Sequence, residues 1–85
     1  MKKEYYVIKV GEVYVKNTYG KNTYCGSTYI YVVPTPDITK AKNYKTLRAA
    51  SKIRDKISAY FEMKKIDAKI SIYKVEVEMN IAELE

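Results

Sequence analysis

One helical repeat of apolar residues in the second half of the chain constrains the fold most. Thr46 is the predicted N-cap of this helix. Apolar residues follow it at every third or fourth position, namely Leu47, Ala50, Ile53, Ile57 and Tyr60 or Phe61. This spacing places them on one face of a helix and leaves charged residues on the remainder. The apolar stripe needs a partner surface, which the other segments of the chain must supply.

Alternating apolar residues predict a hairpin near the start of the chain. Its strands are residues 5–10 and 13–16, and the two residues between them begin with Gly11, as a type II′ turn prefers. Pairing across this turn places four aliphatic side chains on one face, in the pairs Val10–Val13 and Ile8–Val15. The opposite face, which we expect to be partly exposed, receives Val7, Lys9, Tyr14 and Lys16.

Two further strands are predicted from composition and alternation. Residues 29–33 are aromatic and β-branched, and Pro34 is expected to end this strand. Residues 68–79 form the last strand, in which the apolar residues change phase between Ile72 and Tyr73. We expect a bulge or bend at that position, because an extra residue would bring both apolar sets onto one face.

These segments predict an α+β fold with the order β-β-β-α-β. A short helical turn capped by Asp37 precedes the main helix. The natural architecture is a small antiparallel sheet with the amphipathic helix packed across one face. With 85 residues, the chain is expected to form a single domain that covers residues 1–85.

The residue types that most enzymes use are scarce in this chain. It has no His and a single Cys, Cys25. It therefore lacks the usual general base, the commonest metal ligand and any thiolate cage or internal disulfide. Glu76 and Glu78 share a strand face, but a solvated face beside Lys74 is the simpler interpretation. We expect a protein that is not an enzyme and that has no metal or other cofactor.

No targeting or membrane segment is expected. Lys9 interrupts the first apolar run, and no small-residue cleavage site follows it. No uncharged stretch approaches the roughly 18 residues that a membrane helix needs. The single cysteine and the lysine-rich composition favour a reducing cytoplasm.

Ten tyrosines in 85 residues are the most unusual feature of the composition. A degenerate repeat places Tyr19, Tyr24 and Tyr29 five residues apart, so on one continuous strand they would alternate between faces. Turns are therefore expected in this repeat, at Asn17, Gly20, Asn22 and Gly26. The tyrosines expected to be exposed, and so available for binding, are Tyr14, Tyr19, Tyr24 and Tyr31. Those expected in or beside the core are Tyr6, Tyr60 and Tyr73. The alternative to a binding role for the exposed tyrosines is simple cross-strand packing on a small sheet.

Basic residues concentrate on the predicted helix and its flanks. The net charge of +6 divides into +2 for residues 1–39, +7 for residues 40–69 and −3 for residues 70–85. Lys45 directly precedes the helix, and Arg48, Lys52 and Lys56 repeat every four residues along one side of it. Such a row of like charge would be relieved by an anionic partner. The alternative is a solvated helix face, and no recognised nucleic-acid-binding motif accompanies the row.

Three segments carry a resemblance to a known group of proteins. They are residues 6–15 (YVIKVGEVYV), 37–44 (DITKAKNY) and 45–50 (KTLRAA). The chain resembles, over roughly residues 5–57, small uncharacterised accessory proteins of phages and prophages of Gram-positive bacteria. The resemblance implies a protein that acts by binding in the cytoplasm of an infected or lysogenic host. It also implies an anti-defence role, for example as an anti-CRISPR inhibitor, with a host defence protein or its nucleic acid as the partner.

Three functional hypotheses follow from these patterns. The first is the non-enzymatic phage-type inhibitor, which would use the basic helix face together with the exposed tyrosines. The second is a small module that binds DNA, RNA or a nucleotide, with an affinity that falls steeply with salt. The third is a self-associating structural protein in which an edge strand or the tyrosines form a homodimer.

Overall fold

The computed structural model describes residues 2–22, 28–78 and 82–83, with backbone only for residues 21, 22, 28 and 29. Its elements are β1 (Lys2–Val10), β2 (Val13–Asn22), β3 (Thr28–Thr35), the 3-10 turn η1 (Ile38–Lys40), α1 (Leu47–Lys64) and β4 (Ile70–Glu78). The predicted α+β class and the β-β-β-α-β order are confirmed. Tyr24, Cys25 and Gly26 lie outside the described residues.

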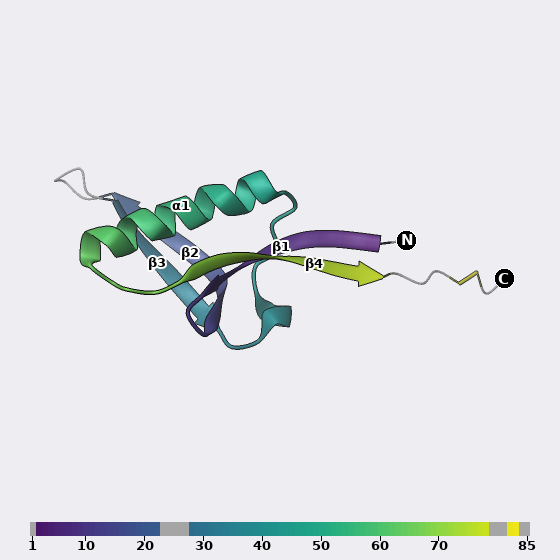
Figure 1. Cartoon of the computed structure of the whole chain (residues 1–85). Coiled ribbons are helices and arrows are strands. Elements are labelled where there is room, and N and C mark those ends of the chain that lie inside the picture. Colours follow the sequence, from purple (N-terminus) through teal and green to yellow (C-terminus); the bar gives the residue numbers. More distant parts are fainter. Residues whose placement is uncertain (1, 23–27, 79–81, 84–85) are drawn as a thin grey trace.

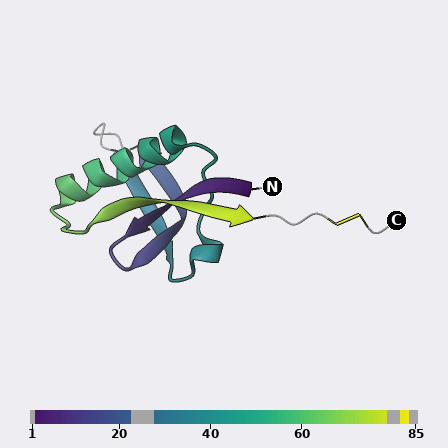
Figure 2. The same ribbon diagram turned by 45° about the vertical axis from the view of Figure 1, so that its right-hand side comes forward.

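The four strands form one antiparallel sheet in the order β3-β2-β1-β4. Helix α1 lies across one face of the sheet, and η1 lies on the far side of the sheet from α1 (Figure 1). Figure 2 shows that β1 and β4 continue together beyond the start of α1 as a two-stranded ribbon. We call the face that α1 covers the helix face and the other one the open face.

The β1–β2 hairpin has the predicted turn but less pairing than expected. Gly11 has φ of +58°, and among the described residues other than glycine only Lys65 has a positive φ. A negative φ at the second turn position agrees with a type II′ turn. Val10 pairs with Val13 as predicted.

The expected Ile8–Val15 strand pair is wrong, because another segment lies between β1 and β2. Tyr44 exchanges both backbone hydrogen bonds with Tyr6, each with an N···O distance of 2.8 Å. The Lys42 amide donates to the Val15 carbonyl over 2.9 Å. These bonds satisfy strand groups that would otherwise pair with each other, so the two strands separate beyond the turn.

The hydrophobic core lies between α1 and the helix face. Its buried members are Ile8, Val15, Ile30, Tyr44, Ala50 and Ile57. Partly buried side chains pack around them, including Ile53, Tyr60 and Phe61 from α1 and Tyr6, Val10, Val32, Ile70 and Ile72 from the strands. The core positions predicted for Tyr6 and Tyr60 are confirmed. Leu47 does not join the core and is 53% exposed, because it is the first residue of α1.

The described part of the tyrosine repeat is strand, and the predicted turns at Asn17 and Gly20 are wrong. Both residues lie within β2 and pair with β3, opposite Val33 and Ile30. The register shifts between Val15 and Asn17, so a bulge at that point changes which residues of β2 face the helix. Pro34, expected to end the third strand, lies inside β3; an outer strand tolerates a residue that lacks an N–H.

The bulge predicted in the last strand is also wrong. The register of β4 against β1 runs without a shift from Ile70–Val10 to Glu78–Lys2. Both apolar phases of β4 are used, one on each face: Ile72 packs against the core, whereas Tyr73 lies on the open face and is 44% exposed. The core position predicted for Tyr73 is therefore wrong.

Both predicted caps are confirmed. Thr46 Oγ1 accepts a hydrogen bond from the Ala49 amide at 3.1 Å. Asp37 Oδ1 accepts one from the Thr39 amide at 2.9 Å and one from the Thr39 hydroxyl at 2.7 Å. These bonds lower the pKa of Asp37 from its ordinary value, because they favour the ionised carboxylate. The local sequence therefore determines where both helical segments begin.

Candidate binding surface

The open face carries a group of tyrosines that the strand register brings together. Directly opposed residues share a face, and Ile8, Val15, Ile30 and Ile72 mark the helix face. The residues between them therefore project to the other side. Among side chains that the structure describes, the tyrosines of the open face are Tyr5, Tyr14, Tyr19, Tyr31 and Tyr73.

The two most exposed tyrosines of this group are Tyr19 on β2 and Tyr31 on β3. They lie directly opposite each other in the register and are 58% and 55% exposed. The Asn17 amide donates to the Tyr19 hydroxyl at 3.2 Å. Their predicted exposure is confirmed, while Tyr14 is only partly exposed and Tyr24 lies outside the described residues.

The middle of the open face holds a lysine between two aromatic rings. Lys9 Nζ lies 5.7 Å from the ring centroid of Tyr14 and 5.9 Å from that of Tyr73. Such placement is a cation–π arrangement that holds the ammonium group over the sheet. Val7, expected to be partly exposed, is fully buried, with Tyr73 directly across from it in the register.

Negative charge is absent from the described strand side chains of the open face. The strand carboxylates are Glu4, Glu76 and Glu78, and their register positions place all three on the other side. There Lys74 Nζ lies 3.5 Å from Glu4 and 3.4 Å from Glu76. The pKa of Lys74 is raised mainly by the charge of the nearby Glu4 carboxylate. The hydrogen bond between Lys74 and Glu76 raises it further. The charges of the open-face strands are therefore those of lysines, including Lys3 and Lys9.

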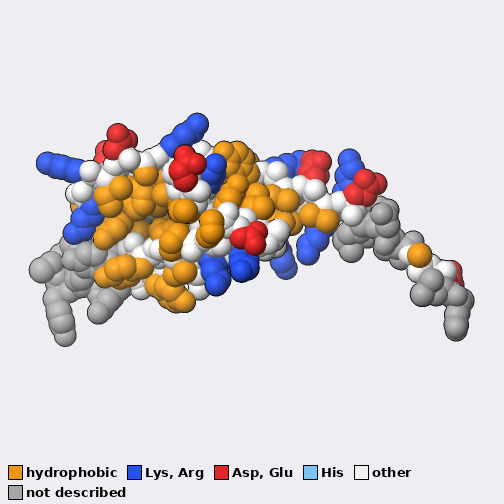
Figure 3. Space-filling model, turned by 90° about the horizontal axis from the view of Figure 1, so that it is seen from below, with side chains coloured by type: hydrophobic (Ala, Val, Ile, Leu, Met, Phe, Trp, Pro, Cys, Tyr) orange, Lys and Arg blue, Asp and Glu red, His pale blue; other side chains and the backbone are white. Residues whose placement is uncertain are grey.

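Hydrophobic side chains gather across the middle of the surface seen from below Figure 1. In this view Lys and Arg side chains lie mainly around that patch, and acidic groups also lie at its borders (Figure 3). Exposed apolar residues of the strands include Tyr19, Tyr31, Tyr73 and Val77. A contiguous exposed apolar surface with polar borders is typical of an interaction site.

The basic residues predicted for binding lie on a different surface from the tyrosines. Lys45, Arg48, Lys52 and Lys56 are all exposed, and all but Lys45 belong to α1. Because α1 covers the helix face, its basic row and the open-face tyrosines lie on opposite sides of the sheet. The structure therefore does not bring the two predicted halves of the site into one surface.

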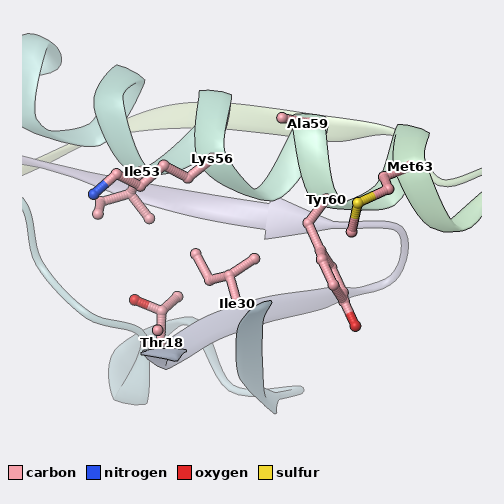
Figure 4. Close-up of a pocket in the computed structure, with 8 residues that line it drawn as sticks. Thr18, Ile30, Ile53, Lys56, Ala59, Tyr60 and Met63 are labelled. Carbon is pink, nitrogen blue, oxygen red and sulfur yellow. The ribbon is translucent and has the colours of Figure 1, made fainter. Parts of the chain in front are cut away.

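A pocket between α1 and the β2–β3 pair is a feature that the sequence did not indicate. Its volume is about 410 Å³, and its walls include Ile53, Lys56, Tyr60 and Met63 from α1 and Thr18 and Ile30 from the strands. In Figure 4 the Tyr60 ring extends from α1 beside Ile30, with Thr18 below. Helical spacing of Ile53, Lys56, Tyr60 and Met63 places them on one flank of α1, but only the position of the sheet makes this flank a pocket.

Comparison with known proteins adds no relative: no protein-family model, no curated protein and no solved structure matches the chain. The described residues contain no cluster of three or more His, Cys, Asp or Glu side chains that could hold a metal ion. In the same residues, no helix has the length and apolar character needed to cross a bilayer.

Proposed function

We propose that this chain is a non-enzymatic binding protein whose open face binds single-stranded nucleic acid. The observation that carries the proposal is the composition of that face. Five tyrosines share it, Lys9 lies between two of their rings, and the described strand side chains add no carboxylate. Unpaired bases stack on aromatic rings, and each stacked base typically contributes about 1–3 kcal/mol to binding.

A single strand fits this surface better than a duplex. The open face presents rings on a sheet rather than an element shaped for a groove, and the bases of a duplex are already stacked on one another. Lys3 and Lys9 supply positive charge for the phosphates. The basic row of α1 adds a long-range attraction from the other side of the molecule, which raises the encounter rate.

A second candidate is a protein partner at the same face. Exposed rings such as Tyr19 and Tyr31 are typical of the residues that dominate protein interfaces. In the phage accessory role that the resemblance implies, this partner would be a host defence protein, and the chain would be an anti-defence inhibitor such as an anti-CRISPR protein. The two candidates differ in whether the isolated chain binds an oligonucleotide directly.

Fluorescence anisotropy with labelled oligonucleotides tests the proposal. The probes are single-stranded DNA, single-stranded RNA and a duplex of the same sequence. We expect tighter binding of a single strand than of the duplex, with an affinity that falls as salt rises. Equal binding of single strand and duplex, or no binding of any probe, would contradict the proposal and favour the protein partner.

Matched variants locate the binding face. Tyr19→Ala combined with Tyr31→Ala should weaken single-strand binding by about 30-fold or more, because each lost ring removes at least about 1 kcal/mol of stacking. Leu47→Ala removes an exposed apolar side chain from α1 instead and should leave binding unchanged. Circular dichroism checks that both variants fold. If the double variant binds like the wild type, the open face is not the nucleic-acid site.

A further inference from the structure

The pocket between α1 and β3 has the properties of a groove for an acidic, apolar segment. Its lining is mainly apolar, including Ile30, Ile53 and Tyr60, and a volume of about 410 Å³ lies within the range of about 300–1,000 Å³ typical of ligand pockets. Lys56 lies in its wall. Lys52 is exposed one turn earlier on α1. β3 is an outer strand, so no further strand closes that side.

One segment of the chain matches these properties. Residues 79–85 read Met-Asn-Ile-Ala-Glu-Leu-Glu and contain three large apolar residues and two glutamates. Ala82 and Glu83, the two residues of this segment that the structure describes, are exposed. The charge of the segment is opposite to that of the basic row. Leu84, flanked by Glu83 and Glu85, combines an apolar anchor with negative charge on both sides.

The segment starts far from the pocket of its own copy. The pocket lies beside the C-terminal half of α1, which includes Tyr60 and Met63. β4 follows α1 and runs away from that end of the helix for nine residues, about 26 Å at the rise of a strand. Seven further residues span at most about 25 Å. Figures 1 and 2 agree that β4 ends at the opposite end of the molecule from the C-terminus of α1.

We propose that residues 79–85 of one copy occupy the α1–β3 pocket of a second copy. Apolar side chains of the segment, Leu84 foremost, fill the pocket, and Glu83 and Glu85 lie at its mouth beside Lys52 and Lys56. This association uses neither the open face nor its tyrosines, so it can be tested separately from the proposed function.

A charge-swap experiment on the full chain tests this association. Sedimentation velocity after nuclease treatment measures the mass of the wild type over a range of concentrations at low salt. We expect the wild-type mass to increase with concentration. Lys52→Glu with Lys56→Glu should abolish this increase, as should Glu83→Lys with Glu85→Lys. An equimolar mixture of the two double variants should restore association, because the reversed charges again match.

Each outcome of this experiment either supports or overturns the proposal. A wild type that stays monomeric at every concentration overturns the proposal. Double variants that associate like the wild type overturn it too, and so does a mixture that fails to restore association. The Tyr19→Ala, Tyr31→Ala variant should associate normally while losing nucleic-acid binding. Failure of one proposal is thereby distinguished from failure of the other.

Filling the pocket provides a second test that does not depend on charge. Ala59 lines the pocket on the surface of α1, so Ala59→Leu should occupy the space and abolish association without disturbing the core. Ser58 is exposed on α1 next to it and is not among the pocket residues. Ser58→Leu is therefore the matched control and should associate like the wild type. Equal behaviour of the two variants would show that the pocket is not the docking site.

Discussion

At the scale of single residues, Tyr44 has the most unusual environment. Its ring belongs to the core, its hydroxyl is buried without a hydrogen-bond partner, and burial raises the pKa of that hydroxyl. A buried polar group without a partner destabilises a protein by about 1–3 kcal/mol. The Lys42 ammonium lies 5.7 Å from the ring centroid, which leaves the hydroxyl oxygen itself unsatisfied.

Tyr44→Phe is therefore expected to stabilise the protein. The ring and its packing are retained while the unsatisfied hydroxyl is removed, so the free energy of unfolding should rise by about 1 kcal/mol. For a domain of this size that gain corresponds to an increase in melting temperature of about 4–8 °C. Urea and thermal unfolding measure the change, with the partly exposed Tyr73→Phe as the control that should stay within about 0.5 kcal/mol. A destabilised Tyr44→Phe protein would mean that the hydroxyl has a partner.

At the scale of elements, the end of α1 stores local strain. Lys65 adopts φ of 57° and ψ of 38°, the left-handed conformation that favours glycine. Its amide donates to the Glu62 carbonyl at 3.2 Å, and the Ile66 amide donates to the Phe61 carbonyl at 2.8 Å. These bonds terminate the helix and hold Lys65 in the left-handed conformation.

Lys65→Gly should relieve this strain. The left-handed conformation disfavours a residue with a Cβ by about 1–2 kcal/mol, and part of the gain is offset by the greater flexibility of glycine in the unfolded chain. We expect a net stabilisation of about 0.5–1 kcal/mol, measured by urea unfolding. Lys65→Ala removes the same charge but keeps the Cβ, and it should give no such gain. Similar gains for both variants would assign the effect to charge instead.

At the scale of the whole molecule, stability should fall at alkaline pH. The pKa of Tyr44 is raised above its ordinary value of 10.0 by burial, and that of Lys74 is raised above 10.5, mainly by Glu4. In both cases the unfolded chain releases its proton first as pH rises. The contribution of each group to the free energy of unfolding is therefore fully present below its ordinary pKa. It is lost as pH rises through the pKa that the group has in the folded protein.

Urea unfolding at pH values from about 8 to about 11 measures this loss. The free energy of unfolding of the wild type should decrease above about pH 10, the range in which Tyr44 ionises in the unfolded chain. Tyr44→Phe should show a smaller decrease, because it removes the buried ionisable group, whereas Lys74 is exposed and contributes little. Identical pH profiles for the two proteins would exclude Tyr44 as the source.

Some elements of this molecule follow from local sequence, and others do not. The hairpin turn at Gly11, the cap at Thr46 and the apolar stripe through Ala50 and Ile57 depend on residues within a few positions of one another, and all were predictable. The Ile8–Val15 pair failed because the distant Tyr44 segment competes for the same backbone groups. Competition of this kind leaves no local signal, since it depends on where residues 42–44 lie in space.

The candidate site, too, was predictable from local sequence only in part. Exposure of Tyr19 and Tyr31 was predicted, and Tyr31 was expected on a strand, whereas Tyr19 was expected on a loop and lies on β2. The bulge expected near Ile72 rested on the assumption that a strand buries one face only. Tyr73 and Val75 instead lie on a second, partly apolar face, and Tyr5 joins them there. Apolar residues in both phases of β1 and β4 were the signal that could have revealed this surface.

The sequence by itself determined which residues share a side of each element, because periods of 2.0 and 3.6 residues are properties of the backbone. It likewise determined where the helices begin, because Asp37 and Thr46 cap through contacts two or three residues away. Only the tertiary structure decided the strand order β3-β2-β1-β4, the face that α1 covers and the separation of the basic row from the tyrosines. Those features depend on competition among distant surfaces for burial and for backbone hydrogen bonds, and that competition is settled only when the whole chain packs together.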